Sequence, residues 1–145
     1  MNAIFLDTWT FQALADRGDP EHQTVRERMR QAARLQLKPV TSSYVINEAL
    51  TRLRTRAGYG VALDFGKGMR RAEADGVIEI VAIDTDEQRL LEAAWRFFKR
   101  YDQLAGLSFT DCTSFAVMKR YGIIYALAED ENFERVNLGF RIFRG

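Results

Sequence analysis

Hydrophobic and polar positions along the chain form two kinds of segment. The apolar runs at residues 4–6 and 123–127 are short and have no polar face, which is typical of strands buried inside a parallel sheet. Longer segments place apolar residues three or four positions apart, as in the stripe over residues 45–57, which predicts amphipathic helices. Strands separated by helices favour a parallel sheet covered on both faces. We therefore predict an α/β fold of three layers, with a central, mostly parallel β-sheet flanked by helices.

Capping and turn signals predict where these elements begin and end. Asp19 before Pro20 is expected to cap a basic helix that runs to about residue 35, and Thr110 is expected to cap a helix that begins at Asp111. Residues 85–88 match the capping-box pattern at the start of another helix. The predicted strands are 4–6, 38–41, 77–83, 123–127 and 140–143, and the predicted helices are 8–15, 20–35, 42–57, 61–75, 85–101, 111–121 and 131–136. Without a repeat or a linker, residues 1–145 are expected to form one domain.

Composition narrows the class of protein. The chain has 145 residues, of which 47% are hydrophobic, so it can build a substantial core. Its one cysteine excludes an internal disulfide and fits a reducing compartment, and one histidine with one cysteine excludes a structural zinc site. The sequence contains neither an 18-residue apolar stretch nor a signal-peptide pattern at its start. We expect a cytoplasmic protein without a membrane segment.

Charge is nearly balanced overall but unevenly distributed. The net charge is +1, yet residues 17–71 carry 12 Lys and Arg against 5 Asp and Glu, whereas the remaining residues carry 9 against 15. A basic region beside an acidic one could hold a phosphate backbone next to a metal site. The alternative interpretation is ordinary solvated helix faces.

Four carboxylates occupy positions that an α/β topology would bring together. Asp7 and Asp130 follow the two apolar strands, Asp111 opens an apolar helix, and Glu48 lies one turn into another helix. Ligands of parallel α/β sheets bind outside the carboxyl ends of the strands, so residues distant in sequence can meet there. Carboxylate oxygens are the ligands that hard divalent cations prefer. The pattern indicates a metal site suited to phosphodiester hydrolysis.

Each acid also has a purely structural interpretation when it is taken alone. Asp7 could simply cap the following helix, and Glu48 could form a surface ion pair with Arg52 one turn later. The charge of Asp111 would be favoured by the helix dipole. Asp130 lies between two glutamates, so Glu129 could point toward the site in its place.

The surroundings of the four acids resemble the PIN-domain ribonucleases of the VapC-like toxin type. The resemblance covers essentially the whole chain and rests on Ile-Phe-Leu-Asp-Thr at 4–8, Thr-Ser-Ser-Tyr-Val-Ile-Asn-Glu at 41–48, Leu-Ser-Phe-Thr-Asp-Cys at 107–112, and Ala-Leu-Ala-Glu-Asp-Glu-Asn-Phe at 126–133. It implies that Asp7, Glu48, Asp111 and Asp130 are the catalytic residues and bind Mg²⁺ or Mn²⁺. It also implies products with a 5′-phosphate and a 3′-hydroxyl. Ala128 departs from the family pattern, since many members have a hydroxyl residue there.

Substrate contacts are expected from polar residues beside the acids. Thr8 could hold a water or metal ligand through its hydroxyl, and Arg52, Arg54 and Arg56 extend from the helix that carries Glu48. The expected substrate is RNA, either single-stranded or in a structured loop. The aromatic residues Tyr44, Trp9 and Phe11 could stack on unpaired bases, although core packing is favoured for Phe11.

The resemblance also implies partners and leaves alternatives. VapC-like toxins pair with a cognate antitoxin protein and commonly form homodimers. One alternative is a PIN-like nuclease of RNA processing that has no antitoxin, and another is a non-catalytic PIN-like module that binds RNA or protein. A receiver domain is disfavoured because it needs adjacent acids after the first strand, and a haloacid-dehalogenase-type phosphatase is disfavoured because Trp9 replaces its second aspartate.

Overall fold

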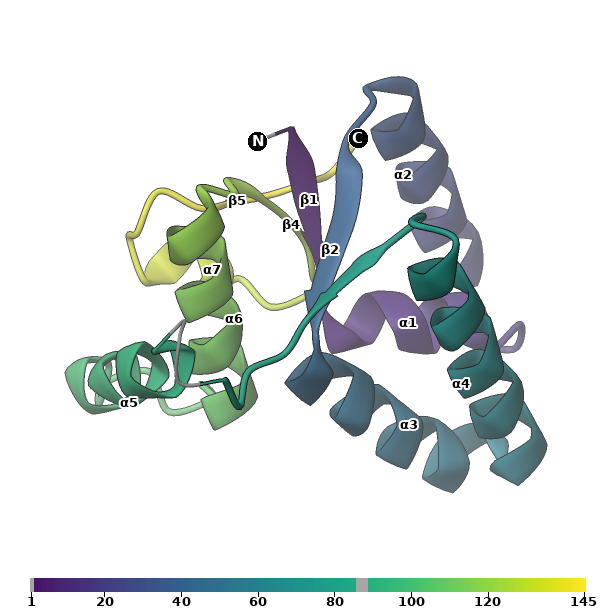
Figure 1. Ribbon diagram of the computed structural model, residues 1–145, viewed down its shortest axis with the longest axis horizontal. Helices are drawn as coiled ribbons and strands as arrows, with labels where there is room; N and C mark the ends of the chain where they lie inside the picture. The colour runs from purple at the N-terminus through teal and green to yellow at the C-terminus, as the bar shows by residue number, and fades with distance from the viewer. Residues whose placement is uncertain (1, 86–88) are drawn as a thin grey trace.

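A five-stranded parallel sheet forms the centre of the computed structural model, which describes residues 2–85 and 89–145 (Figure 1). The strands are β1 (Ala3–Leu6), β2 (Lys38–Ser42), β3 (Glu79–Val81), β4 (Tyr125–Leu127) and β5 (Arg141–Ile142). Their order in the sheet is β3-β2-β1-β4-β5, and each neighbouring pair is parallel. The predicted three-layer α/β fold is confirmed, with a sheet that is parallel throughout the described strands.

Helices cover the sheet on both sides. They are α1 (Thr8–Ala15), α2 (His22–Arg34), α3 (Ser43–Ala57), α4 (Tyr59–Ala74), α5 (Leu90–Arg100), α6 (Phe109–Tyr121) and α7 (Asn132–Arg135). In Figure 1, α5 and α6 lie on one side of the sheet, whereas α1, α2 and α4 lie on the other. Gly58 alone separates α3 from α4, because its φ of 100° belongs to the left-handed region that glycine tolerates. In the described residues, no helix combines the length and the apolar character needed to cross a bilayer.

The core explains why the shortest apolar runs become the central strands. All four residues of β1 are buried, as expected for the middle strand of a sheet with helices on both faces. Large aromatic side chains are buried between helices, where Phe115 of α6 packs edge-to-face against Phe133 of α7 with ring centroids 5.0 Å apart. This packing gives the ends of the strands a rigid support.

The strand order reverses between β1 and β4, and that reversal creates the site. The chain moves outward from β1 through β2 to β3, and then returns to β4 on the other side of β1. Asp7 N donates to the carbonyl of Leu127 at 3.1 Å, so β1 and β4 end side by side. The hydroxyl of Thr10 donates to the same carbonyl and that of Thr41 donates to Leu6 O, both at 2.7 Å. Parallel sheets bind ligands at such a reversal, outside the carboxyl ends of the strands.

Several predicted boundaries are wrong. Asp19 does not cap a helix from Pro20, because its carboxylate accepts a hydrogen bond from Glu21 N at 2.8 Å in a turn and α2 begins only at His22. The strands predicted at 77–83 and 140–143 shorten to β3 and β5, which are edge strands with one pairing neighbour each. The capping box predicted at 85–88 includes residues outside the described part of the chain.

Candidate active site

Asp7 lies where β1 passes into α1, and its carboxylate is the most perturbed acid of the site. The residue occupies the N-cap position but its side chain makes no capping hydrogen bond, so capping does not explain it. Only 8% of Asp7 is exposed. Its pKa is raised from 3.8 to about 7, chiefly by burial and then by the charges of Asp111, Glu48 and Asp130, while a hydrogen bond with the backbone of Thr8 opposes the shift. Asp7 therefore lies close enough to the other three acids to be affected by their charges.

Asp111 is held in the first turn of α6 by a reciprocal hydrogen-bond pair. The predicted cap, Thr110, is wrong: Ser108 is the N-cap, and its hydroxyl accepts from Asp111 N at 3.0 Å. Ser108 N in turn donates to Asp111 Oδ2 at 3.1 Å, which completes a capping box. The pKa of Asp111 is raised to about 6, because burial and the charges of Asp130 and Glu48 together outweigh the lowering by the two hydrogen bonds with Ser108. Sequence reasoning missed Ser108, although the pattern Ser-x-x-Asp could have identified it.

Asp130 is fixed after β4 by Asn132. Its Oδ1 accepts from Asn132 N at 2.8 Å, and its Oδ2 accepts from the Asn132 amide nitrogen at 3.2 Å. Asn132 is itself buried at the start of α7. The charge of Asp130 raises the pKa of both Asp7 and Asp111, whereas neighbouring Glu129 is exposed and does not contribute to either shift. Of the two acids, Asp130 is the one that faces the cluster.

Glu48 belongs to the cluster and to an ion pair at the same time. Its Oε1 lies 3.0 Å from Arg52 Nη2, as its structural interpretation requires. It also raises the pKa of Asp7 and Asp111, and it lines a cavity of about 360 Å³ together with Thr110 and Tyr44. The two interpretations of Glu48 are therefore compatible.

The four acids are electrostatic neighbours but are not drawn into one coordination sphere. Within residues 2–85 and 89–145, no three His, Cys, Asp or Glu side chains converge on a single ion position. Three of the acids have a local partner instead: Glu48 pairs with an arginine, Asp111 with the start of its own helix, and Asp130 with an asparagine. These local hydrogen bonds and the ion pair fix where each carboxylate points.

Two polar side chains of α1 are buried beside the acids. The hydroxyl of Thr8 has no hydrogen-bond partner among the described residues, which is unusual for a buried polar atom. One turn further on, Gln12 accepts from Arg56 Nη1 at 3.4 Å through its amide oxygen, and its amide nitrogen has no partner in the described structure. Sequence reasoning missed Gln12, which its four-residue spacing from Thr8 could have indicated.

The three arginines of α3 divide between two directions. Arg52 contacts Glu48 and Arg56 contacts Gln12, so both lie on the side of α3 that faces the site. Arg54 instead lies over the ring of Tyr59 in α4, 5.0 Å from its centroid. Positions four apart share a helix face and positions two apart do not, which explains the division.

The remaining candidates lie in different environments. Phe11 is buried against Phe65 with centroids 5.4 Å apart, which confirms core packing. Trp9 is partly buried, and the guanidinium of Arg28 lies 5.9 Å from its ring centroid. Burial raises the pKa of Cys112 to about 11, so its thiol is not poised as a nucleophile.

An apolar groove elsewhere on the molecule does not compete with this site. It measures about 740 Å³ between α1, α2 and α4, and Phe11, Met29, Phe65 and Met69 contribute to its wall. None of the four clustered acids lines it. The groups suited to hydrolytic chemistry lie at the ends of β1 and β4.

Known proteins place the chain in a family. The PIN domain family matches residues 4–138. Two curated relatives are 35% identical to the chain over 130 residues, which are 90% of this chain and 91% of theirs. Both are called 23S rRNA-specific endonuclease VapC20. They come from Mycobacterium tuberculosis strains CDC 1551 / Oshkosh and ATCC 25618 / H37Rv. The crystal structure of Mycobacterium tuberculosis VapC20, described as a Sarcin-Ricin loop cleaving toxin, superposes with a TM-score of 0.79 and 31% identity over 96% of this chain and 97% of that one. The chain therefore belongs to the PIN domain family.

Proposed function

We propose that this protein is a divalent-metal-dependent endoribonuclease and the toxin of a toxin–antitoxin pair. The observation that carries the proposal is the meeting of Asp7, Glu48, Asp111 and Asp130 at the reversal of strand order, where burial and mutual repulsion raise the pKa of Asp7 and Asp111. Carboxylates whose pKa values are strongly shifted by burial and by neighbouring charges are candidates for a functional site. Membership of the PIN domain family and the endonuclease relatives support the same activity.

The donor set fits Mg²⁺ or Mn²⁺. Four electrostatically coupled carboxylates and the unpartnered hydroxyl of Thr8 offer the hard oxygen ligands that these cations prefer. A bound cation would compensate the repulsion among the acids, activate a water and stabilise the leaving oxygen. Glu48 contacts Arg52 through Oε1, so its Oε2 could bind a cation while the ion pair is kept.

Other residues of the chain orient the acids and can bind the substrate. Ser108 and Asn132 orient Asp111 and Asp130 through backbone-anchored hydrogen bonds, so these carboxylates need little reorganisation. Gln12 holds Arg56 toward the site, where the guanidinium can bind a phosphate of the substrate. The role of Arg54 as a substrate ligand stays a prediction, since its side chain lies over Tyr59.

The proposed substrate is the sarcin–ricin loop of 23S ribosomal RNA, because the relatives that cover almost the whole chain are named for cleavage of that RNA and that loop. Ribosomal RNA implies action in the cytoplasm, and a toxin implies a cognate antitoxin. A homodimer is also proposed, on family resemblance, and sedimentation velocity would test it. The alternative, a PIN-like nuclease without antitoxin, would be favoured if the gene has no small antitoxin gene beside it.

The test is cleavage of purified ribosomes by the protein and by Asp7→Asn. The intact protein with Mg²⁺ or Mn²⁺ should produce one dominant cut in 23S RNA with a 5′-phosphate end, and excess EDTA should abolish it. Asp7→Asn should lower the rate by at least about a hundredfold while the protein stays folded, because one charged ligand is lost. Asp75→Asn, which changes an exposed aspartate at the end of α4, is the matched control and should cut normally. Wild-type cutting by Asp7→Asn, or undiminished cutting in EDTA, would remove the basis of the proposal.

A further inference from the structure

A polar cavity opens beside the acid cluster, between α3 and the start of α6. It measures about 360 Å³, and every side chain that lines it carries a polar group. One face of α3 and the second residue of α6 form its walls, which consist of Tyr44, Asn47, Glu48, Thr51, Arg52 and Thr110. We call it the α3–α6 cavity. Its lining suits a small ligand that forms hydrogen bonds, unlike the apolar groove between α1, α2 and α4.

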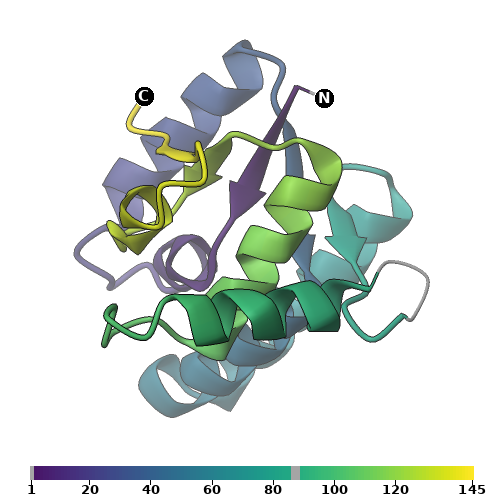
Figure 2. The same ribbon diagram turned by 90° about the vertical axis from the view of Figure 1, so that its left-hand side faces the viewer.

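The α3–α6 cavity adjoins the acids directly. Glu48 belongs both to the cavity and to the acid cluster, and Thr110 is the residue before Asp111. Helices α3 and α6 are in contact, and Figures 1 and 2 both show α3 and the lower end of α6 at the lower end of the molecule. An RNA strand with one phosphate at the acids would therefore bring a neighbouring base to this cavity.

The charges of the lining favour an uncharged ligand. Glu48 and Arg52 are charged, but they compensate each other, with Oε1 of the glutamate 3.0 Å from Nη2 of the arginine. A phosphate would meet a carboxylate beside a guanidinium that is already paired, so it would gain little. A nucleobase is uncharged and presents hydrogen-bond donors and acceptors along its edges. The lining therefore favours a base over a phosphate.

The size and polarity of the cavity also distinguish a base from a second copy of the chain. A stable protein–protein interface covers about 800 Å² on each partner, and its centre is apolar. The α3–α6 cavity is a small hollow at the lower end of the size range of ligand pockets, and its lining is polar throughout. A single base fits these properties better than a protein surface does.

Asn47 and Thr51 supply groups that can recognise the edge of a base. The hydroxyl of Thr51 donates to the carbonyl of Asn47 at 3.0 Å, which leaves the hydroxyl oxygen available as an acceptor. The side chain of Asn47 is exposed at the cavity, and its amide forms no hydrogen bond within residues 2–85 and 89–145. An amide donates and accepts side by side. This pattern complements adenine, in which N6 donates beside the acceptor N7.

Tyr44 supplies an aromatic wall that is held in place. Its hydroxyl donates to Asp84 Oδ1 at 3.1 Å, in the segment that follows β3. The ring is partly buried and lines the cavity. Every base has a face that can stack on such a ring, whichever groups its edge presents. Tyr44 can therefore bind the face of a base while Asn47 binds its edge.

We infer that the α3–α6 cavity binds one unpaired adenine of the RNA beside the cleaved phosphate, with Tyr44 against its face and the amide of Asn47 on its edge. This inference rests on the proposed ribonuclease function and assigns Asn47 as a residue that determines base specificity. Such a site favours loops over duplexes, because only an unpaired base can leave its neighbours and enter a cavity.

The test measures base preference in binding, separately from cleavage. In an Asp7→Asn background with EDTA, fluorescence anisotropy gives the affinity for hairpin RNAs that carry each of the four bases in turn at each loop position. The parent should prefer adenine at one position. Asn47→Ala and Asn47→Leu should bind the adenine RNA about five- to a hundredfold more weakly and should bind all four bases there about equally. Gln23→Ala, which removes an exposed amide on α2, is the matched control and should keep the preference of the parent.

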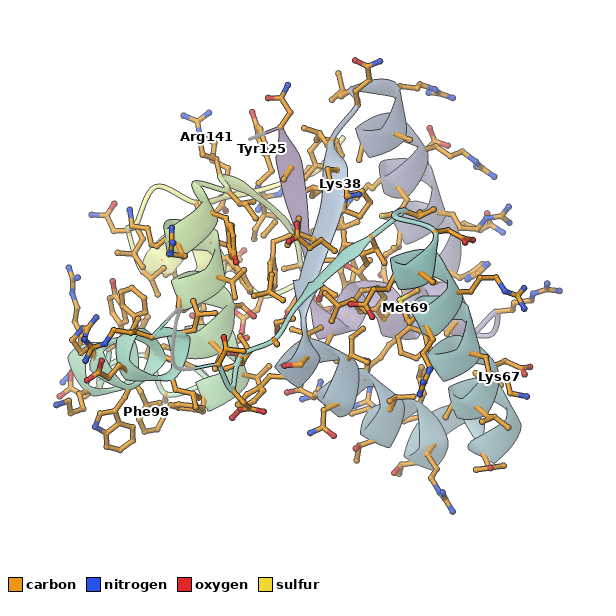
Figure 3. The ribbon with its side chains drawn as sticks, viewed as in Figure 1. Lys38, Lys67, Met69, Phe98, Tyr125 and Arg141 are labelled. Carbon is orange, nitrogen blue, oxygen red and sulfur yellow. The ribbon has the colours of Figure 1, made fainter. Side chains whose placement is uncertain are left out.

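Variants of Tyr44 test the wall of the cavity. Tyr44→Ala should weaken binding by about five- to a hundredfold, the range measured for lost base–aromatic stacking, whereas Tyr44→Phe keeps the ring and should retain most of the affinity. Tyr125→Ala is the control, because this exposed tyrosine is labelled in Figure 3 at the opposite end of the molecule from α3. It should bind RNA as the parent does.

Three results would overturn the inference. The first is an unchanged base preference in Asn47→Ala and Asn47→Leu, and the second is a parent that binds all four bases equally at every loop position. The third is a lower mass of Asn47→Ala in sedimentation velocity, which would assign the cavity to a second copy of the chain. If the wild-type protein fails to cut RNA but Asn47 sets the base preference, the proposed function is lost and the base site stands.

Discussion

At the scale of single residues, Asp7 is where folding and chemistry conflict. Its carboxylate is buried among three other acids, and its pKa is raised from 3.8 to about 7. The folded state therefore holds this proton more tightly than the unfolded state does. Such a group favours folding below about pH 4, and its contribution is lost as the pH rises through 7. At pH 8 the ionised carboxylate costs stability unless a cation compensates it.

The Asp7→Asn substitution should therefore stabilise the metal-free protein in a pH-dependent way. In EDTA at pH 8, we expect the free energy of unfolding to rise by up to about 4 kcal/mol, because each unit of pKa shift corresponds to about 1.4 kcal/mol. At pH 4 the difference should vanish, since Asp7 is then protonated in the folded protein. Urea denaturation at both pH values measures this difference in the free energy of unfolding. The control, Asp75→Asn, should have the same free energy of unfolding as wild type at both pH values. Equal stability of Asp7→Asn and wild type at pH 8 would contradict the raised pKa.

At the scale of elements, α6 positions a catalytic acid through its own N-cap. Ser108→Ala removes the hydroxyl that accepts from Asp111 N and should cost about 1 kcal/mol of stability. It should also slow RNA cleavage by about ten- to a hundredfold, the usual effect of losing a group that orients a metal ligand. Ser42→Ala is the matched variant, because Ser42 caps α3 through Val45 N at 3.2 Å without bonding an acid. Ser42→Ala should lose a similar amount of stability but cleave RNA at a near-normal rate. Equal cleavage rates of Ser42→Ala and Ser108→Ala would show that the Ser108 cap does not orient Asp111.

The positions of helices and strands could be predicted from the sequence where the pattern of apolar residues determines them. They were predicted less well where contacts between distant segments determine them. The stripe on α3 and the buried run of β1 appear as predicted, because burial on one face or two leaves a direct pattern. The start of α6 was placed two residues late. Phe109 packs against Trp95 and Phe98 of α5, and this contact, which is absent from the local sequence, accompanies extension of the helix back to Phe109.

At the scale of the whole molecule, the meeting of four acids from distant segments followed from parallel topology alone. The contacts around them did not. Gln12 binds Arg56 of another helix through a contact made only in the folded chain, and no sequence pattern showed that, within the described residues, no three of the acids would converge on one ion position. Topology brings side chains to one edge, whereas their final positions depend on individual hydrogen bonds and on charge.

Because one ion would join segments 7, 48, 111 and 130, binding of Mg²⁺ or Mn²⁺ should stabilise the entire fold. A metal concentration a hundredfold above the dissociation constant adds about 2.7 kcal/mol to the free energy of unfolding. Protons compete for the same carboxylates, so the gain in melting temperature should be larger at pH 8 than at pH 5.5. The difference between the two proteins should consequently narrow: Asp7→Asn melts above wild type in EDTA, and wild type gains on it as Mn²⁺ is added. A melting temperature of wild type that does not respond to either metal at pH 8 would contradict binding at the four acids, because a ligand that binds only the folded state must stabilise it.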